Sequence, residues 1–398
     1  MKLYICICFL SLAITTMAEE INLERVLSDG SKQFTAKMFF EVAQSNQDKS
    51  VVLSAFSVMP PLAQLALASD DESHDEILNA IGMPNDNITK AAFSHITSKL
   101  RSVKGVTLKT ANKIYIGKPY QLNEKNSDIA RESFDSEIES IDFVKNEEAA
   151  ARVNAWVEDQ TNHRIKDLVD KSKLTGDTRA LLVNAIYFKG TWSTAFDKTA
   201  TRDKYFHISK EEQVSVPTMY NKGYYNYADN KELNAQILEI SYEGDESSFV
   251  IVLPREIDGI QKLEKKLKDP SALDKAMNDM RNTEVEVYLP KFKIETTTDL
   301  KLVLEKINVS KLFSPGLAKL SKLIKNRGDL YIESATQKAF IDINEEGAEA
   351  AAANVFYVYE ITSFNFKPPT PQFVANRPFY FAVKTNSLTL FNGIVRRV

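Results

Sequence analysis

The sequence predicts an α+β fold built as one large domain. Apolar residues at helical spacing dominate the first half of the chain, and β-rich apolar runs dominate the second half. This segregation of helices from strands is typical of α+β proteins. The length of 398 residues could hold two or three domains. No Gly/Ser-rich or Pro-rich linker and no internal repeat divides the chain, so we expect a single domain.

The first 18 residues have the pattern of a signal peptide. Lys2 supplies the positive end, Leu3 to Ile14 is the apolar stretch, and residues 16–18 (TMA) offer small side chains for cleavage before Glu19. The apolar stretch is shorter than the roughly 20 residues that a membrane-spanning helix needs. We therefore expect a cleaved signal at residues 1–18 and a secreted, extracellular protein without a membrane anchor.

Cysteine usage and charge restrict the chemistry of the mature chain. Both cysteines, Cys6 and Cys8, lie in the signal segment, so the remaining 398 − 18 = 380 residues carry no disulfide and no thiol nucleophile. Without Lys2 the chain has 49 basic and 54 acidic residues, a net charge of −5. No run of basic residues indicates a nucleic-acid partner. We expect no metal and no cofactor.

Helical spacing and strand-like runs alternate in the first half. Phe34, Met38 and Val42 recur at the spacing of a helix face, and Val51–Phe56 has the composition of a strand. Pro60 and Pro61 fit only the first turn of a following helix. A further strand is expected over Thr107–Ile116. A further helix is indicated by one apolar stripe of Ala150, Val153, Val157, Ile165 and Leu168.

The second half is predicted to be mostly strands. Arg179–Phe188 is almost entirely apolar, as expected of a central strand buried on both faces. Five more runs have strand composition: Phe249–Leu253, Glu284–Ile294, Ala339–Ile343, Pro378–Val383 and Leu388–Val395.

The segment Glu345–Phe366 (EEGAEAAAANVFYVYEITSFNF) is open to two interpretations. Alanine favours helix by intrinsic propensity, which predicts a surface helix or linker. However, the run lacks an apolar stripe at helical spacing. Its small side chains would also fit an exposed loop that enters a sheet as an extra strand.

Eight short motifs stand in a fixed order along the chain. They are VVLSAFS at Val51, ANKIY at Ala111, NAIYFKGTW at Asn184, VPTMY at Val216, LPKFKIE at Leu289, INEEGAEAAAAN at Ile343, NRPFYF at Asn376 and LFNGIV at Leu390. In this order they resemble the serpins, the serine protease inhibitor family, and most of all the insect haemolymph inhibitors. The resemblance covers residues 19–398 and implies a serpin fold: one large domain with a central sheet able to accept the reactive-centre loop (residues 345–366) as an extra strand, further sheets and about nine helices.

The resemblance also implies site residues. Ser54, Ser57 and Asn184 fall where the main sheet parts, and Trp192 lies where the loop first enters it. Gln337 stands where the family usually has a histidine; an amide can donate and accept, so we expect the polar network to persist without a pH response. The hinge of the loop is Glu345, Glu346, Gly347, Ala348, Glu349, Ala350, Ala351, Ala352 and Ala353.

Counting fourteen residues from the hinge glycine, as in inhibitory serpins, places the reactive bond at Ile361-Thr362. Aligning the following Ser363-Phe364 with insect relatives gives Thr362-Ser363 instead, and we prefer the first count. No Lys or Arg occurs between Glu345 and Phe366. The expected target is therefore elastase- or chymotrypsin-like rather than trypsin-like.

The expected partner is an extracellular serine protease, held in a covalent 1:1 complex by a monomeric inhibitor. The alternative is a non-inhibitory serpin that acts as a carrier, storage protein or chaperone.

No enzyme signature is present, and we expect no catalytic residues. The chain has no GxSxG elbow, HExxH pair or phosphate-binding glycine loop, and its four histidines are scattered. Two sequons, at Asn87 and Asn308, are glycosylation candidates in a secreted protein, although an unused surface asparagine is as plausible at either position.

Overall fold

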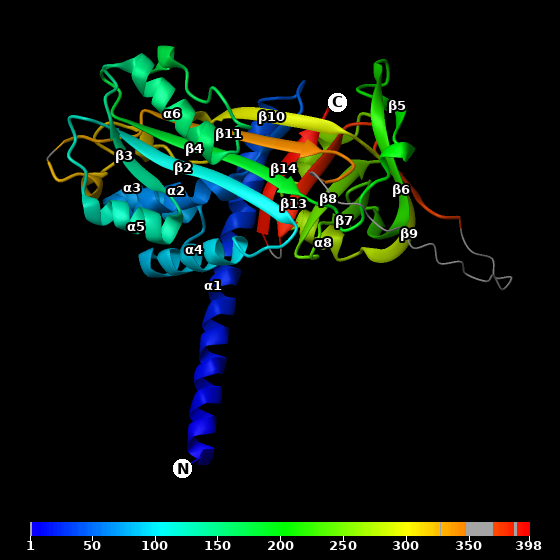
Figure 1. Cartoon of the computed structure of the whole chain (residues 1–398), viewed down its shortest axis with the longest axis horizontal. Coiled ribbons are helices and arrows are strands. Elements are labelled where there is room, and N and C mark those ends of the chain that lie inside the picture. The colour runs from blue at the N-terminus through cyan, green and yellow to red at the C-terminus, as the bar shows by residue number, and fades with distance from the viewer. Residues whose placement is uncertain (1, 327, 348–368, 386–387) are drawn as a thin grey trace.

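A computed structural model describes residues 2–326, 328–347, 369–385 and 388–398, with side chains from residue 22 onward. The N-terminal part of α1 projects from the rest of the molecule (Figure 1). None of the described helices is long and apolar enough to cross a membrane. The α-helices in these residues are α1 (Lys2–Gln44), α2 (Ala55–Ala68), α3 (Asp71–Ala80), α4 (Asp86–Leu100), α5 (Glu124–Phe134), α6 (Asn146–Gln160), α7 (Ile260–Lys266), α8 (Ala272–Met277) and α9 (Leu300–Lys306).

The described strands form two sheets. The first has five strands, in the order β10 (Phe292–Asp299), β11 (Ser334–Ile343), β4 (Ala180–Gly190), β2 (Val106–Gly117) and β3 (Glu137–Ile141). The second has nine strands, in the order β1 (Val51–Leu53), β14 (Leu388–Val395), β13 (Phe379–Thr385), β8 (Ser247–Pro254), β7 (Ala235–Ser241), β6 (Gln213–Asn230), β9 (Arg281–Pro290) and β12 (Gln372–Val374), with β5 (Arg202–His207) paired to β6.

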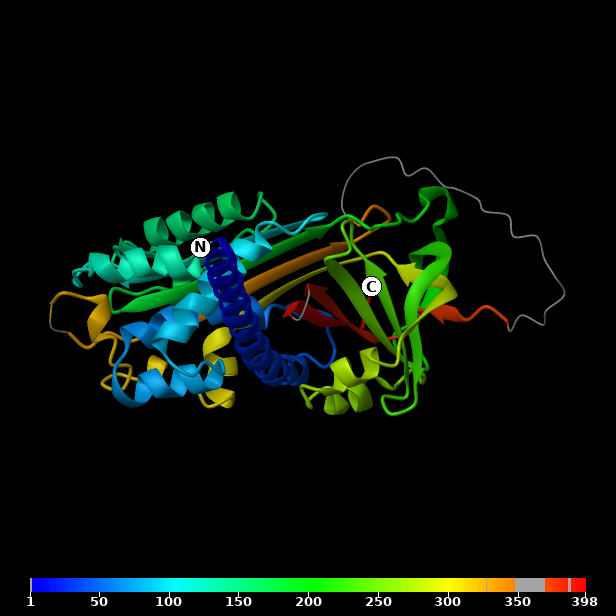
Figure 2. The same cartoon turned by 90° about the horizontal axis from the view of Figure 1, so that it is seen from below.

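The five-stranded sheet is covered on both faces. Helix α6 lies on one face, whereas α2 and its neighbours lie on the other. Helices α2 to α6 gather at one end of the molecule, whereas β5, β6 and β9 lie toward the opposite end together with α8 (Figures 1 and 2). Alternate residues of β4 divide between two apolar clusters. Leu182 and Ile186 belong to the large core shared with the nine-stranded sheet, while Val183 and Ala185 pack in the smaller cluster with residues of α6. The predicted central strand is confirmed, since every residue of β4 except Lys189 is buried.

The two prolines of α2 lie further into the helix than expected. The sequence predicted that Pro60 and Pro61 begin a helix, but α2 starts at Ala55, where Ser54 caps it by accepting from Ser57 N. Proline removes a backbone donor and normally disturbs a helix interior. Here α2 is buried on nearly all sides, so tertiary packing outweighs the local preference.

Three other element boundaries differ from the prediction. The strand expected over Val51–Phe56 ends at Leu53, because α2 already begins at Ala55. The helix expected to reach Leu168 ends at Gln160, because Asn162 and His163 adopt positive φ angles of 52° and 58° that no helix tolerates. Ile165 and Leu168 nevertheless pack in the cluster with α6. The run Glu284–Ile294 is two strands, since the chain leaves the nine-stranded sheet at Pro290 and joins the five-stranded sheet at Phe292.

Candidate hinge and sheet-opening site

The boundary between β4 and β11, here called the seam, is a parallel pairing at the centre of the five-stranded sheet. Its register runs from Ser334↔Leu181 to Ile341↔Phe188. After β11 the chain turns at Asn344–Gly347, and Gly347 N donates to Asn344 O at 3.1 Å. A strand joined to the end of β11 and placed in the seam would run antiparallel to both neighbours. Such a strand could pair with both of them at once.

Gln337 ties β11 to β4 and α2 across the seam. It lies opposite Asn184 in the register, and both side chains are fully buried. Gln337 Nε2 donates to Asn184 Oδ1 at 2.6 Å and to Ser54 O at 2.8 Å, and Gln337 Oε1 accepts from Ser54 N at 3.1 Å. Ser57 Oγ completes the network by donating to Asn184 Oδ1 at 2.9 Å. The structure thus brings Ser54, Ser57, Asn184 and Gln337 together.

Pro61 prepares α2 for this network. A residue with a backbone N–H at position 61 would donate to Ser57 O, four residues earlier, as in any α-helix. Proline lacks that donor. Asn184 Nδ2 takes its place and donates to Ser57 O at 3.0 Å. The proline inside the helix therefore frees a carbonyl that joins α2 to the central strand.

Asn112 is a member of this network that the sequence reasoning missed. It lies on β2, opposite Asn184 in the register, and its Oδ1 accepts from Asn184 Nδ2 at 2.5 Å. The side chain is only 4% exposed. The available signal was its place in the motif ANKIY at Ala111, since the strand run Thr107–Ile116 mixes polar and apolar residues. Buried polar side chains need partners.

Trp192 holds the chain segment that follows β11. Its indole Nε1 donates to Asn344 O at 2.8 Å and its backbone N donates to Glu346 O at 3.2 Å. Phe196 N donates to Glu345 O at 2.9 Å. Trp192 therefore lies at the end of the seam opposite its start at Ser334, where residues after β11 would enter the sheet.

The two carboxylates in the described part of the hinge, Glu345 and Glu346, are both paired. Glu345, 5% exposed, accepts from Lys291 Nζ and Thr201 Oγ1, each at 2.8 Å. Burial alone would raise the pKa of Glu345, but these hydrogen bonds outweigh it and the net pKa lies below its ordinary value. Glu346 pairs with Lys198. The sequence reasoning missed all three partners, since they come from segments about 50 to 150 residues away.

Among the described hinge residues, Gly347 has the strictest steric requirement. Its φ is +79°, and a Cβ there would lie 2.4 Å from Gly190 O and 2.5 Å from Trp192 N. Backbone atoms of the β4 end therefore occupy the space that any side chain would need. Only glycine lets the hinge rest on the end of β4.

The other predicted site residues are placed as follows. The rest of the hinge, Ala348 to Ala353, and the reactive-bond candidates Ile361 and Thr362 lie outside the described residues. Asn87, near the start of α4, and Asn308, after α9, are both exposed.

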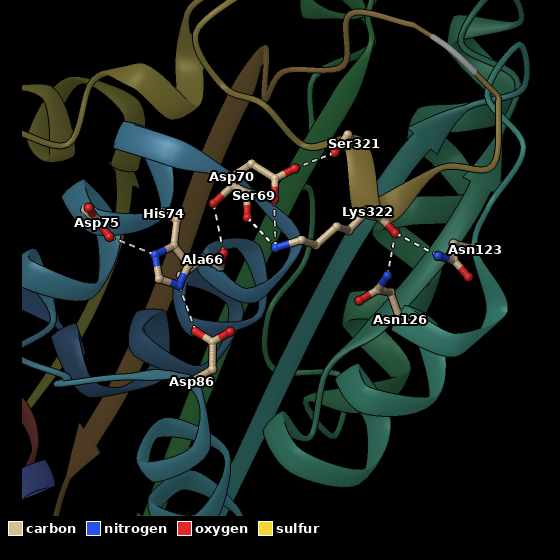
Figure 3. Close-up of polar contacts among 10 residues, drawn as sticks. All are labelled: Ala66, Ser69, Asp70, His74, Asp75, Asp86, Asn123, Asn126, Ser321 and Lys322. Atoms are coloured by element: carbon tan, nitrogen blue, oxygen red, sulfur yellow. Dashed lines mark hydrogen bonds and ion pairs between the residues drawn. The ribbon is translucent and has the colours of Figure 1, made fainter.

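A second polar network joins three helices (Figure 3). His74 of α3 lies between Asp86 Oδ1 at 2.7 Å and Asp75 Oδ1 at 2.9 Å. Burial alone lowers the pKa of His74, but the two carboxylates outweigh it and raise the net pKa. Lys322 binds Asp70 at 2.9 Å, and its carbonyl accepts from Asn123 at 3.0 Å. His74 thus joins α3 to α4, while Lys322 joins the residues at the start of α3 and of α5 to the segment that leads into β11.

The chain belongs to the serpin family. The family model described as "Serpin (serine protease inhibitor)" matches residues 29–398. The resemblance and the fold inferred from the motifs are thereby confirmed, and the nine α-helices found in the described residues agree with the expected number.

Moth serpins are among its similar relatives. Alaserpin of Manduca sexta is 52% identical over 391 residues, covering 98% of this chain and 99% of that protein. Antitrypsin of Bombyx mori is 50% identical, covering 98% of both chains. Among solved structures, Serpin48 of the insect Tenebrio molitor superposes with a TM-score of 0.85 at 35% identity, covering 94% of this chain and 99% of that chain.

Proposed function

We propose that this serpin is a secreted suicide-substrate inhibitor of serine endopeptidases. The observation that carries the proposal is the parallel seam between β4 and β11, followed directly by a docked hinge and then an alanine-rich run. The run has the small side chains that a strand inserted into a packed sheet requires. Moth relatives named Alaserpin and Antitrypsin support an inhibitory role.

In the proposed mechanism the protease treats the loop as a substrate. The protease serine attacks one loop peptide bond and forms an acyl-enzyme. The cut loop then enters the seam and carries the attached protease with it, which distorts the protease before water can release it. About ten new backbone hydrogen bonds at roughly 1 kcal/mol net each would supply on the order of 10 kcal/mol. The intact protein is then kinetically trapped rather than at its lowest free energy.

Opening the seam requires the Gln337 network to break or rearrange. Gln337 bonds both to Asn184 on β4 and to Ser54 beside α2. An entering strand would separate β11 from β4 and remove the direct contact between the two amides. We infer that this network keeps the sheet closed until the loop is cut.

The reactive bond is proposed to be Ile361-Thr362. Ala348 to Ile361 comprises 14 residues, which span roughly 48 Å when extended at about 3.4 Å per residue. The seam has eight paired positions, or roughly 27 Å, so a strand of 14 residues would fill it and extend beyond it. A β-branched residue before the bond fits elastase-like pockets, whereas Tyr359 would attract chymotrypsin-like proteases and shorten the inserted strand.

Mass spectrometry of the cleaved protein after denaturation tests this assignment. We expect a C-terminal fragment that begins at Thr362. A fragment that begins at Ser363 would favour the second alignment. A start at any other residue would contradict the insertion-length argument.

The proposed partner is an extracellular serine protease, bound 1:1 and covalently by a monomeric inhibitor. Secretion rests on the signal pattern of residues 1–18, and glycosylation at the exposed Asn87 and Asn308 would agree with it.

Denaturing electrophoresis after mixing with pancreatic elastase, chymotrypsin and trypsin tests the function. We expect a band at the summed mass with elastase or chymotrypsin. Cleavage without such a band, by every protease of the panel, would favour the non-inhibitory alternative.

A further inference from the structure

A polar hollow on the nine-stranded sheet has no part in the proposed mechanism. It is a cavity of about 130 Å³ at the place where β6 pairs with β9 on one side and with β7 on the other. Asn226 of β6 lies opposite Asn282 of β9 and opposite Glu239 of β7. Residues directly opposite each other share a face of a sheet. The three side chains therefore converge on one surface of the molecule.

Glu239 is the only charged residue among the described residues that line the hollow. Its two carboxylate oxygens accept hydrogen bonds from neutral groups, Oε2 from Asn226 Nδ2 at 2.9 Å and Oε1 from Ser248 Oγ at 2.7 Å. The nearby Glu284 of β9 has Lys222 at 3.8 Å, whereas Glu239 forms no ion pair within the described part of the chain. The hydrogen bonds fix the position of the Glu239 carboxylate without neutralising its charge.

Two tyrosines also line this hollow. Tyr224 is 65% exposed, although it is a large aromatic side chain, and Tyr225 follows it in β6. The face of a tyrosine ring attracts cations. A guanidinium group both donates hydrogen bonds to a carboxylate and stacks on aromatic rings. An uncompensated carboxylate beside tyrosines is therefore suited to a guanidinium group, whereas an anion would be repelled by Glu239.

The hollow is bounded on another side by the segment that follows β4. Ser193 and Thr194 line it, and Ser193 N donates to Ser241 O of β7 at 3.0 Å. We propose that this hollow binds one guanidinium group, with Glu239 neutralising its charge and Tyr224 packing against it. The group can belong to a free small molecule or to an arginine side chain on the surface of a partner protein. This site is separate from the seam and does not depend on the proposed inhibitory function.

Titration of the whole protein with N-acetyl-L-argininamide, followed by calorimetry at low ionic strength, tests the site. We expect saturable binding of one molecule per chain, and weaker binding in about 0.5 M NaCl because salt screens the charge pair. N-acetyl-L-citrullinamide has a similar shape but an uncharged ureido group, and it should not bind measurably. Equal binding of the two probes would overturn the inference.

Two variants locate the binding to this hollow. Glu239→Gln keeps the shape of the side chain and should weaken binding roughly tenfold or more, because a charge-assisted hydrogen bond is lost. Tyr224→Ala should weaken binding roughly two- to fivefold through loss of the ring contact. Tyr205→Ala is the matched control, since Tyr205 of β5 is 62% exposed but does not line the hollow. Melting midpoints show whether each variant is folded, and the exposed Tyr224 still decides the question if Glu239→Gln is not.

Competition separates the two sources of the guanidinium group. Saturating N-acetyl-L-argininamide should slow the inhibition of pancreatic elastase if an arginine of the protease occupies the hollow. It should leave the rate unchanged if the natural ligand is a small molecule. Glu239→Gln measured alongside reveals any effect of the probe on elastase itself.

Absence of binding to wild type, or binding that Glu239→Gln and Tyr224→Ala both leave unchanged, would overturn the inference. If wild type inhibits no protease, the proposed function fails, while the titration with N-acetyl-L-argininamide still decides whether the hollow is a binding site.

Discussion

By its resemblance to the family, Gln337 stands where a histidine is expected, and its amide bonds both to Asn184 on β4 and to Ser54 at the start of α2. Three buried acceptors lie within hydrogen-bond distance of Nε2, at Ser54, Ser57 and Asn184. An amide does not titrate, so this network contributes equally to stability at pH 5 and pH 8. These contacts join β11 to β4 and to the start of α2. A substitution at Gln337 therefore tests whether they keep β11 paired with β4.

Gln337→Leu should destabilise the intact protein by about 1–3 kcal/mol for each buried group left unpaired. Gln337→His should restore a pH response, because burial lowers the pKa of an imidazole below its ordinary value of about 6.5. Stability of that variant should be full above pH 6.5 and fall as the pH drops through the lowered pKa. Denaturant midpoints at several pH values measure both effects. A wild-type-like pH profile for Gln337→His would contradict the buried geometry.

Glu345 provides a second test of pH dependence, because its carboxylate titrates whereas the amide of Gln337 does not. Its pKa is below the ordinary 4.5 in the folded protein, so its contribution is present above pH 4.5 and is lost as the pH falls through the lowered value. Glu345→Gln should therefore cost about 1–3 kcal/mol at pH 7 and progressively less in acid. Melting curves at pH 7 and pH 4 measure the difference, and Glu132→Gln on the exposed side of α5 is the control. A cost that is the same at both pH values would show that the Lys291 pair contributes nothing.

At the scale of the secondary-structure element, the face that each loop residue presents after insertion into the seam decides whether its side chain is buried. Side chains of a strand alternate between its two faces. By likeness to the family, Ala348, Ala350 and Ala352 would face the packed side after insertion, whereas Glu349 would face outward. The inward faces of the flanking strands are apolar and closely packed around Ile186 of β4 and Ala339 of β11.

Ala350→Arg should convert the inhibitor into a substrate. Burying an unpaired arginine costs on the order of several kcal/mol, and 1.4 kcal/mol on the insertion barrier is already about tenfold in rate. Cleavage at the same bond should persist with little covalent complex on denaturing gels. Glu349→Arg is the control and should reduce the yield much less. Equal yields from wild type and Ala350→Arg would rule out insertion of the alanine run.

The sequence predicts an element well where its own residues determine it, and poorly where contacts with distant segments determine it. The buried central strand was readable because burial on both faces leaves a continuous apolar run. The positions of Pro60 and Pro61 were not, because α2 is stabilised by packing that local preference does not reveal. The pairing of Lys291 with Glu345 joins segments 54 residues apart, and no local pattern encodes such a contact. Motif resemblance located Ser54, Ser57, Asn184 and Trp192, but it assigned no role to Asn112, although this residue lies within the motif ANKIY.

At the scale of the whole molecule, β4 pairs directly with β11, so no strand is inserted between them in the central sheet. Nicking the loop without trapping should raise the melting midpoint by roughly 10 °C or more, given about ten added backbone hydrogen bonds. Calorimetry of intact and nicked protein measures the shift. An unchanged midpoint would mean that the intact protein is already at its free-energy minimum.

The position of the last strands has a consequence for the molecule after cleavage. A cut after Ile361 leaves 398 − 361 = 37 residues on a separate chain. That chain includes β12, β13 and β14, and β13 lies between β14 and β8 with every residue buried. The cleaved protein is then a heterodimer whose subunit interface is its own hydrophobic core. Its two chains should migrate together under native conditions at any dilution and separate only when the protein unfolds.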